Sequence, residues 1–482
     1  MLEISANEVL ESLRAENPWW ELGRIDRRYE ALPRRAYFDS FYELAVERSI
    51  RRAVILMGPR RVGKTVMMQQ AIQRLINEGV AASRILYVSV DTPTYTGMAL
   101  ERLVRLFLDA NAVGRDDESF VLFDEVQYLK NWENHLKVLV DKYPSVNFVA
   151  SGSSAAALAR ASKESGAGRF TDFHLPPLTF AEYLAFVGRE DVIASGCPNG
   201  YSKQKWEAVD INALNAEFIN YINYGGYPEA VFSDLARDNP ARYVKSDIIE
   251  KVLLRDLPSL YGINDVQELN RLFTSIAYNT GNAVSLEKLS QSSGVSKPTI
   301  TRYLDYLEAA FLIVRVRRVD EKANTFARER EFKVYLTNPS MRAALFRPVT
   351  EDSEHMGNMV ETALFSQWLH SETFANLHYA RWKRGRGKGE GEVDIVYVEP
   401  SFLAPAWALE VKWSDRFFEH PDALDGLIEF ARKNELRGVL ATTRTRQGIS
   451  ELEDTVIEQV PCAVYCYVVG KNTVARRIGK GA

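Results

Sequence analysis

Short hydrophobic runs alternate with amphipathic helical segments between residues 53 and 154. The runs read AVILMG at 53–58, RILYVSVD at 84–91, FVLFDEV at 120–126 and VNFVASG at 146–152. Continuous hydrophobic strands separated by helices are typical of a parallel sheet that is covered on both faces. We therefore predict an α/β domain for this part of the chain.

Downstream of this domain the pattern changes. Residues 178–275 are mostly helical, with hydrophobic positions at helical spacing in LTFAEYLAFVG and IIEKVLLRDL. From residue 355 onward helix and strand signals return, in MVETALFSQWL, EVDIVYVE, AWALEVKW and GVLATT. A second mixed pattern needs its own hydrophobic core, so we expect a second α/β domain there.

Composition places the chain among soluble globular proteins. Its 482 residues include 60 Lys and Arg against 64 Asp and Glu, a formal net charge of −4, and 46% of them are hydrophobic. No hydrophobic run approaches the ~20 residues of a membrane span, and the N-terminus lacks the basic and then hydrophobic order of a signal peptide. Cys197, Cys462 and Cys466 fit a reducing compartment. We predict a cytoplasmic protein without a membrane segment, and the charge excludes only a uniformly basic nucleic-acid binder.

The segment Gly58-Pro59-Arg60-Arg61-Val62-Gly63-Lys64-Thr65 fits the phosphate-binding pattern G-x-x-x-x-G-K-[ST]. It follows the run AVILM and opens a helical segment that continues with Val66, which is the context that the motif requires. The glycines allow the loop conformation, and the loop amides and the helix start face the phosphates. Lys64 is expected to reach the β- and γ-phosphates, and Thr65 to bind Mg²⁺. We predict a site for ATP and Mg²⁺ at residues 58–66.

Further strand ends agree with this prediction. Asp124 and Glu125 end the run FVLFDE, where Asp124 is expected to hold Mg²⁺ and Glu125 to polarise the attacking water. Ser151 ends the next strand and is expected to sense the γ-phosphate, although a serine there also caps turns. Arg169 is predicted to contact the γ-phosphate of the same or a neighbouring subunit, with a surface arginine as the alternative.

Together these segments resemble a family of prokaryotic ATPases. The resemblance rests on GPRRVGKT, FDEVQ, the strand end SGSS, GRF followed by LPPLTFAEYL, and the segment Tyr224-Gly-Gly-Tyr-Pro-Glu229. The family pairs an AAA-type ATPase domain (AAA_14) with a C-terminal domain of unknown function, DUF4143. The resemblance implies an ATP-dependent enzyme of the additional-strand (ASCE) P-loop class. The ATPase class also implies a homo-oligomeric ring, which we expect to be a hexamer, but it implies no substrate.

Residues 285–318 have the pattern of a winged helix-turn-helix. A turn at Ser292-Ser-Gly294 separates two helical segments, and a strand that contains Arg315, Arg317 and Arg318 follows as a wing would. In DNA-binding versions the second helix enters the major groove, where this chain would offer Lys297, Thr299, Thr301 and Arg302. DNA is therefore a predicted partner, and the alternative is a helical bundle that makes internal or subunit contacts.

A second group of charged residues lies in the C-terminal part. Glu361 lies in a helical segment, Asp394 near a strand start, and Glu410 and Lys412 on one face of the next strand. This arrangement resembles the PD-(D/E)xK nuclease fold, which restriction enzymes and archaeal Holliday-junction resolvases also use. By that resemblance Asp394 and Glu410 bind Mg²⁺, Lys412 orients or activates water, and Glu361 adds a carboxylate. The alternative is an inactive domain whose carboxylates form ion pairs.

Residues 381–390 read RWKRGRGKGE, with five positive charges and one negative charge. The glycines predict a flexible loop, and Trp382 offers a stacking surface. We expect the loop at 381–388 to contact the phosphate backbone of DNA. The alternative is a solvated hairpin tip.

These patterns predict an α/β protein of five segments. They are a helical lead-in (1–50), an AAA+ P-loop core (51–185), a helical lid (186–275), a winged helix (276–345) and a PD-(D/E)xK nuclease-like domain (346–482). The leading hypothesis is an ATP-hydrolysing motor that binds branched or Holliday-junction-like DNA for remodelling or branch migration, with Mg²⁺-dependent cleavage by the C-terminal domain. The alternatives are a nucleotide-switched, STAND-like regulatory ATPase with an inactive nuclease-like scaffold, and a defence nuclease.

Overall fold

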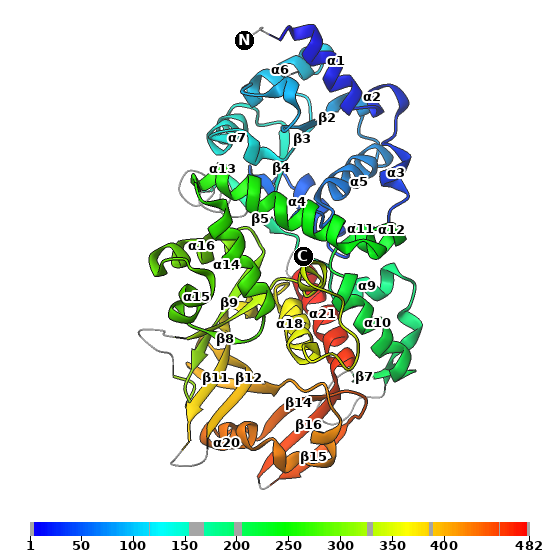
Figure 1. Ribbon diagram of the computed structural model, residues 1–482. Helices are drawn as coiled ribbons and strands as arrows, with labels where there is room; N and C mark the ends of the chain where they lie inside the picture. The colour runs from blue at the N-terminus through cyan, green and yellow to red at the C-terminus, as the bar shows by residue number, and fades with distance from the viewer. Residues whose placement is uncertain are drawn as a thin grey trace. The chain divides into compact units, whose positions relative to one another are not determined.

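The computed structural model describes residues 4–114, 116–153, 168–196, 205–324, 331–384, 389–452 and 454–479 (Figure 1). The chain divides into two compact units. The first contains residues up to Pro176 together with Ala309–Phe311, and the second contains the remainder from Pro177 onward, apart from the last two residues.

The first unit is built around five parallel strands. They are β1 (Ala53–Met57), β2 (Ile85–Ser89), β3 (Ser119–Asp124), β4 (Val146–Gly152) and β5 (Phe170–His174), in the order β2-β3-β4-β1-β5. Strand β4 lies between β1, which leads into the glycine-rich loop, and β3, which ends in Asp124. This arrangement confirms the predicted parallel sheet with an additional strand between these two.

Helices lie on both sides of this sheet (Figure 1). They are α1 (Ala6–Glu16), α2 (Trp19–Leu22), α3 (Arg27–Glu30), α4 (Phe38–Val46), α5 (Lys64–Asn77), α6 (Leu100–Ala110) and α7 (Trp132–Lys142). The side-chain amide of the buried Asn17 pairs with the main chain of the edge strand β2. It accepts a hydrogen bond from Tyr87 N at 2.6 Å and donates one to Tyr87 O at 2.8 Å. The N-terminal helices are therefore part of this unit and satisfy polar groups of its edge strand.

The second unit begins with helical segments. They are α9 (Phe180–Phe186), α10 (Ile211–Tyr224), α11 (Pro228–Phe232), α12 (Asp234–Asp238), the π-helical η5 (Ala241–Glu250) and η6 (Val252–Asp256), α13 (Leu257–Tyr261) and α14 (Val266–Tyr278). A hairpin of β6 (Ile193–Gly196) and β7 (Lys205–Ala208) lies between α9 and α10 in the sequence.

A nine-stranded sheet forms the rest of this unit, in the order β15-β16-β14-β13-β12-β11-β9-β10-β8. The strands are β8 (Ala283–Val284), β9 (Ile313–Val319), β10 (Phe332–Leu336), β11 (Leu377–Lys383), β12 (Glu390–Glu399), β13 (Ala404–Glu410), β14 (Gly438–Thr443), β15 (Gly448–Leu452) and β16 (Thr455–Pro461). The helices are α15 (Leu286–Ser293), α16 (Lys297–Ala309), α17 (Ser340–Leu345), α18 (Met356–Trp368), α19 (Arg416–Glu419), α20 (Asp425–Lys433) and α21 (Cys462–Gly479).

The predicted winged helix and the C-terminal strands share this sheet. Strand β9 pairs with β10 on one side, antiparallel, and with β11 on the other, parallel. The wing strand therefore has main-chain partners on both edges, which removes the exposed edge that a free wing would keep. The predicted boundary between residues 345 and 346 crosses a continuous sheet, and the division into five segments remains a prediction.

The core of the C-terminal part contains α18, which is buried along nearly its whole length and packs beside α21. The order of elements from α18 is a helix, three strands, a helix and a strand: α18, β11, β12, β13, α20 and β14, if the short α19 is set aside. Cys462 and Cys466 are fully buried on α21, as core residues. Among the residues that the structure describes, no helix has the length and hydropathy of a membrane span.

Candidate nucleotide site and C-terminal carboxylate cluster

The glycine-rich loop connects β1 to α5 at the carboxyl end of the first sheet. Gly63 precedes the helix with a φ of 97°, and Arg61 also has a positive φ, of 66°. A Cβ atom on Gly58 would lie 2.2 Å from the carbonyl oxygen of Leu175. Gly63 is therefore required by its backbone conformation and Gly58 by close packing.

Lys64 lies inside the curve of this loop and is only 5% exposed. Its Nζ donates to Gly58 O at 2.9 Å and to Pro59 O at 2.8 Å. The amides of the loop and of the first turn of α5 border the same position, and such amides favour anions. The loop therefore holds a buried cation beside a helix start, as a phosphate site requires.

The predicted metal-binding residues also come together. Thr65 Oγ1 donates to Asp124 Oδ2 at 2.6 Å, and Ser151 Oγ donates to the other carboxylate oxygen, Oδ1. Sequence reasoning missed Tyr87, whose hydroxyl donates to Asp124 Oδ2 at 2.8 Å. Burial, with the charge of Asp124, raises the pKa of Tyr87 well above its usual value, so this phenol stays a donor. The position of Tyr87 on β2, two residues before the strand end, was the only signal available.

Glu125 follows Asp124 with a φ of 56°, in the left-handed region that is uncommon for glutamate. Gln127 Nε2 donates to the Glu125 carboxylate and, at 3.1 Å, to Ser153 Oγ. Burial raises the pKa of Glu125, Lys64 opposes this shift, and Asp124 adds to it. A carboxylate with a raised pKa is a stronger base than an exposed one.

A buried arginine that no motif indicated supports the loop. Arg35 is 5% exposed, and its guanidinium donates to Val62 O at 2.8 Å and to Pro176 O at 3.0 Å. Arg60 donates to the hydroxyl of Tyr128 at 2.5 Å. The loop is thus connected by side chains to segments before and after it in the sequence.

These residues fit ATP with Mg²⁺. The loop at Gly58 packs closely against the main chain of Leu175. Lys64 provides the cation, and Thr65 with Asp124 provides hard oxygen ligands. When bound, Mg²⁺ supplies charge neutralisation to the phosphate oxygens.

Arg169 lies at the opposite end of the sheet. Its carbonyl oxygen accepts from Ala53 N at 2.9 Å, at the start of β1, whereas the glycine-rich loop follows the end of this strand of five residues. At ~3.3 Å per residue the two ends are roughly 16 Å apart. The guanidinium donates to Asp141 at 2.9 Å. This position is incompatible with the predicted contact to the nucleotide of the same chain, and the contact to a neighbouring subunit remains a prediction.

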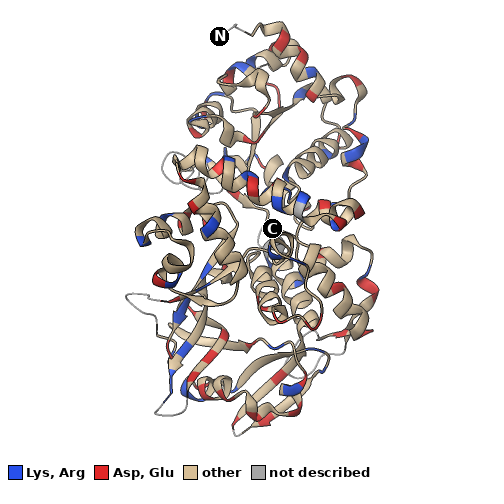
Figure 2. Ribbon diagram, viewed as in Figure 1, with Lys and Arg blue, Asp and Glu red and all other residues tan. Residues whose placement is uncertain are grey.

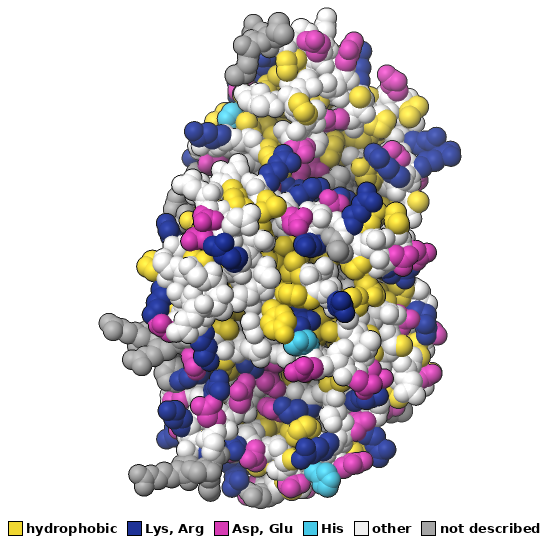
Figure 3. All heavy atoms as spheres, viewed as in Figure 1, with side chains coloured by type: hydrophobic (Ala, Val, Ile, Leu, Met, Phe, Trp, Pro, Cys, Tyr) yellow, Lys and Arg dark blue, Asp and Glu magenta, His cyan; other side chains and the backbone are white. Residues whose placement is uncertain are grey.

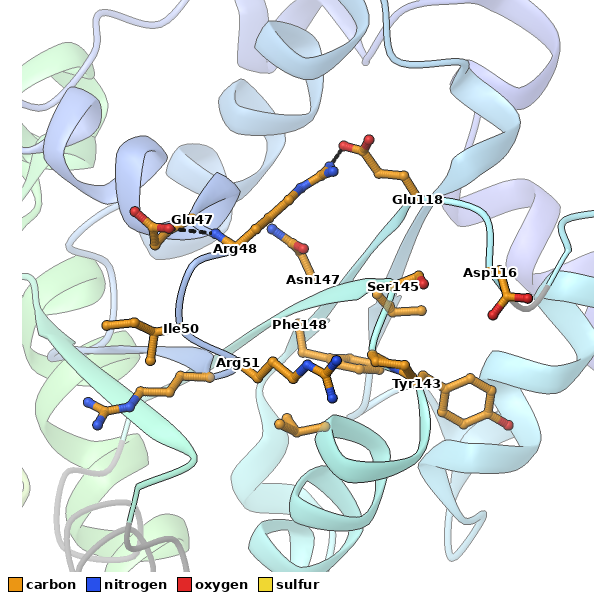
Figure 4. Close-up of a pocket in the computed structure, with 14 residues that line it drawn as sticks. Glu47, Arg48, Ile50, Arg51, Asp116, Glu118, Tyr143, Ser145, Asn147 and Phe148 are labelled. Carbon is orange, nitrogen blue, oxygen red and sulfur yellow. Dashed lines mark hydrogen bonds and ion pairs between the residues drawn. The ribbon is translucent and has the colours of Figure 1, made fainter.

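A second pocket of the first unit, of about 280 Å³, lies at this amino end (Figure 4). Its charged lining residues are three arginines and three acids: Arg48, Arg51, Arg52, Glu47, Asp116 and Glu118. Arg48 forms an ion pair with Glu118 across the pocket (Figure 4). Because the charges balance, the pocket favours neither an anion nor a cation.

In the second unit, α16 buries Ile300, Tyr303, Leu304 and Leu307, the face that the sequence pattern predicted. Lys297, Thr301 and Arg302 are exposed on this helix, and Thr299 is partly exposed. Lys297 on α16 and two arginines on β9 form ion pairs with acids. Arg315 pairs with Asp305 and Glu308, Lys297 with Glu287, and Arg318 with Glu331.

Two arginines of the basic segment 381–384 also form ion pairs with acids. Arg381 pairs with Glu390 at 2.5 Å, and Arg384 with Asp425 at 2.6 Å. Trp382 is 5% exposed and its indole nitrogen donates to the partly exposed Glu429. Hydrophobic contacts with α20 bury the ring, so the prediction of a stacking surface is wrong. Residues 385–388, including Arg386 and Lys388, lie outside the described residues. Basic and acidic positions are interspersed along this unit (Figures 2 and 3).

The predicted carboxylates and lysine of the C-terminal part do meet. Glu361 comes from α18, Asp394 from β12, and Glu410 from β13. Lys412 Nζ donates to Glu410 Oε1 at 2.6 Å and lies 3.9 Å from Asp394 Oδ2. Val411 N donates to Asp394 Oδ2 at 2.9 Å. A cavity of about 480 Å³ is lined by Glu361, Asp394 and Lys412 among others.

A second lysine, absent from the sequence prediction, lies at the centre of this cluster. Lys333 on β10 has a side chain that is 3% exposed, and its Nζ lies 2.8 Å from Glu361 Oε1, 2.9 Å from Glu392 Oε1 and 3.2 Å from Asp394 Oδ1. Tyr335 donates its hydroxyl to Glu361 Oε1 at 2.5 Å. The run FKVYL indicated a strand and gave no sign that its lysine would be buried.

Burial shifts the ionisation of this cluster. It raises the pKa of Glu361 to about 7 and that of Glu410 to about 8, where the charge of Asp394 adds to the effect. Burial opposes the charged form of Asp394 too, but Lys333 and Lys412 hold its pKa below the usual value. The ionised state of Asp394 thus depends on the ammonium groups of Lys333 and Lys412.

The residues present do not fit the Mg²⁺ site predicted at Asp394 and Glu410. Within the described part of the chain, no group of three or more Asp, Glu, His or Cys side chains is arranged to hold a metal ion. The ammonium of Lys412 lies between Asp394 and Glu410, and that of Lys333 lies between Asp394 and Glu361. No chemical step through a metal is derived for this cluster.

Comparison with known proteins gives family matches for two parts of the chain. Residues 50–184 match the family model AAA_14, described as an AAA domain. These residues are an AAA-type P-loop ATPase domain. Residues 215–352, which include the winged helix, match a domain of unknown function, DUF8612. The C-terminal family expected from the resemblance was DUF4143, so this part of the expectation is replaced by DUF8612.

Two relatives match more than two thirds of the chain. The chain is 24% identical over 356 residues to an uncharacterised protein of Haemophilus influenzae, covering 73% of this chain and 82% of that protein. It is 24% identical over 337 residues to the uncharacterised protein MJ1544 of Methanocaldococcus jannaschii, covering 68% and 69%.

Solved structures similar to this chain include the replication initiator DnaA bound to AMPPCP and single-stranded DNA, at 14% identity and a TM-score of 0.27, covering 57% of this chain and 87% of that one. Another is PCH-2 of C. elegans, at 18% identity and a TM-score of 0.25, covering 41% and 58%. A likeness at these TM-scores supports no functional inference for this chain.

Proposed function

We propose that this chain hydrolyses ATP and uses the nucleotide cycle to act on DNA bound by its second unit. The observation that carries the first half is the buried group of Lys64, Thr65, Asp124 and Glu125 at one sheet edge. Lys64 would neutralise the β- and γ-phosphates, and Glu125 would accept a proton from the attacking water. The water oxygen would bond to the γ-phosphorus as the bond to the β,γ-bridging oxygen breaks, giving ADP and phosphate.

Two substitutions separate binding from chemistry. Lys64→Ala is expected to lose ATP binding, because it removes the buried ammonium that lies against the carbonyl oxygens of Gly58 and Pro59. Glu125→Gln is expected to bind ATP but not hydrolyse it. Glu133→Gln on α7 is the control and should hydrolyse ATP at the wild-type rate. Fluorescent-nucleotide binding and phosphate release measure the two steps. Full hydrolysis by Glu125→Gln would refute the assigned role of Glu125.

The DNA half of the proposal rests on α16. Thr301 and Arg302 are exposed on the helix that winged-helix proteins place in the major groove. Because Arg315 and Arg318 of the predicted wing pair with acids, α16 is the surface on which the proposal depends. We expect binding to duplex, forked and four-way DNA, strongest for branched DNA, to fall with salt and with Arg302→Ala. Arg27→Ala on α3 is the control.

Fluorescence anisotropy at stated salt concentrations measures this binding, and phosphate release with each DNA measures stimulation of the ATPase. If Arg302→Ala binds every DNA as the wild type does, α16 is not the DNA surface. If branched DNA leaves hydrolysis unchanged, the coupling is refuted.

A ring of subunits, with six as the expected number, belongs to the same proposal. Arg169 would then reach the nucleotide of the neighbouring subunit, because its place at the amino end of the sheet excludes its own. Arg169→Ala should keep ATP binding and lose hydrolysis, and light scattering with ATP should give the mass of the assembly. A monomer whose hydrolysis survives Arg169→Ala would contradict the ring.

A second candidate function is a nucleotide-switched regulator whose nuclease-like part is a scaffold. The pairing of Glu361 and Asp394 with the buried Lys333 favours it, because the paired carboxylates are held by lysine. This candidate predicts slow ATP turnover that DNA does not stimulate and a monomer that changes shape on nucleotide binding, which small-angle scattering would measure.

A further inference from the structure

We propose that the ammonium of Lys333 takes the place of a divalent cation in the nuclease-like site, which makes this site a metal-free ionic clamp between the winged helix and the C-terminal core. The clamp does not depend on the ATPase domain or on DNA binding. The clamp assigns Lys333 a role that no sequence motif indicated.

The distances around Lys333 are those of an ammonium site. One nitrogen lies 2.8, 2.9 and 3.2 Å from oxygens of Glu361, Glu392 and Asp394. The ammonium group donates hydrogen bonds to Glu361 and Asp394 and forms an ion pair with Glu392. Oxygen ligands lie about 2.0–2.1 Å from Mg²⁺ and 2.3–2.6 Å from Ca²⁺, which is closer than any of these contacts. The oxygens are therefore spaced for hydrogen bonds to nitrogen.

Two of the remaining carboxylate oxygens have other partners, whereas Glu410 Oε2 is buried without a hydrogen-bond donor among the described residues. Asp394 Oδ2 accepts from Val411 N, and Lys412 occupies Glu410 Oε1. A divalent cation between Glu361 and Asp394 would have to displace Lys333, whose side chain is 3% exposed, and so leave a buried ammonium without these partners. Burying an unpaired charge is strongly unfavourable, which keeps Lys333 in place.

The clamp joins segments that are far apart in the sequence. Lys333 belongs to β10, whose neighbours in the sheet are the wing strand β9 and the short β8. Next to the clamp, Asn358 on α18 donates to Thr280 O at 3.2 Å, and the hydroxyls of Thr280 and Thr362 lie 3.0 Å apart. Main chain and side chains of the winged helix thus contact α18 around the ionic group. The position of the winged helix on α18 therefore depends on the carboxylates that hold Lys333.

Mn²⁺ binding to the nucleotide-free full chain, followed by electron paramagnetic resonance, tests the proposal. The wild type is expected to bind no Mn²⁺ through Asp394. Lys333→Met removes the charge while keeping a long side chain, and it should gain a bound Mn²⁺ that a further Asp394→Asn substitution removes. Asp124→Asn in the ATPase domain is the control, because it abolishes any Mn²⁺ held by Thr65 and Asp124 and leaves the clamp intact.

Thermal unfolding with and without Mn²⁺ gives a second readout. The wild-type melting temperature should not change with Mn²⁺, whereas Lys333→Met should melt lower and be restored by Mn²⁺. Wild-type Mn²⁺ binding that Asp394→Asn abolishes and Asp124→Asn does not would overturn the proposal, and so would a folded Lys333→Met that gains no Mn²⁺. The wild-type arm needs no substitution at Lys333, so it decides the question even if Lys333→Met fails to fold.

Discussion

Alanine at position 58 would place a methyl group where the structure has no room. The Cβ atom would lie 2.2 Å from the carbonyl oxygen of Leu175 and 3.2 Å from its carbonyl carbon. The obstacle is main chain, and it is fixed because Leu175 N donates to Met57 O at 2.7 Å, next to the loop. Relief of the contact requires the loop and this segment to separate by about 1 Å in an interior that is close-packed.

The expected cost follows from this displacement. Forcing a methyl group into a packed region costs about 1–3 kcal/mol. For a unit of about 180 residues, each kcal/mol lowers the melting temperature by roughly 2–4 °C, so we expect Gly58→Ala to melt about 2–12 °C lower. Because the loop itself moves, nucleotide affinity should also fall, on the order of tenfold to a hundredfold for a shift of this size.

Calorimetry and titration with a fluorescent ADP analogue measure the two effects. Gly357→Ala on α18 is the control, since nothing lies within 4 Å of its Cβ position and its φ is not positive. That substitution should leave nucleotide affinity unchanged and stabilise the second unit by up to about 1 kcal/mol, the difference in helix propensity. A Gly58→Ala protein with wild-type stability and wild-type ADP affinity would refute the argument that packing against Leu175 fixes the loop.

Three further substitutions test side chains whose burial or pairing the structure defines. Arg35→Met leaves the carbonyl oxygens of two buried segments without their donors and should cost about 2–6 kcal/mol in urea unfolding, whereas the exposed neighbour Arg34→Met should cost under about 1 kcal/mol. Trp382→Ala should cost about 3–5 kcal/mol because the ring is buried, and Lys383→Ala, exposed on the same strand, should change stability by less than about 0.5 kcal/mol. Asp415→Asn should destabilise at pH 7, and this loss should shrink as the pH falls below about 4.

The sign of the Asp415 prediction comes from its pKa. Burial opposes the charged form, but the Thr445 hydroxyl and three main-chain amides donate to the carboxylate and hold its pKa below the usual value. The stabilisation is therefore present above the unfolded-state pKa and is lost as the pH falls through the folded-state pKa. A destabilisation that is constant from pH 7 to pH 3 would contradict this. A Trp382→Ala chain as stable as the wild type would restore the surface-stacking interpretation, and an Arg35→Met chain no weaker than Arg34→Met would remove the support assigned to Arg35.

The sequence by itself determined the ATPase domain and its site. Residues 58–65 are contiguous, and their conformation is set locally by glycines and a helix start. Asp124 and Ser151 end hydrophobic strands, and the carboxyl ends of parallel strands meet at one edge of a sheet. The nine-stranded sheet shows the limit of this reasoning, because strand periodicity predicted β9 and β11 but not that they pair with each other.

Only the tertiary structure decided how charged and aromatic side chains are used. Lys333 lies 28 residues from Glu361 and 61 from Asp394 in the sequence, yet it contacts both. Arg35 supports a loop that begins 23 residues later, and Trp382, in a segment rich in glycine and arginine, is part of a hydrophobic core. The physical reason is common to all three: a side chain's charge or hydrophobicity is local, but its free energy depends on burial and partners, which distant segments provide.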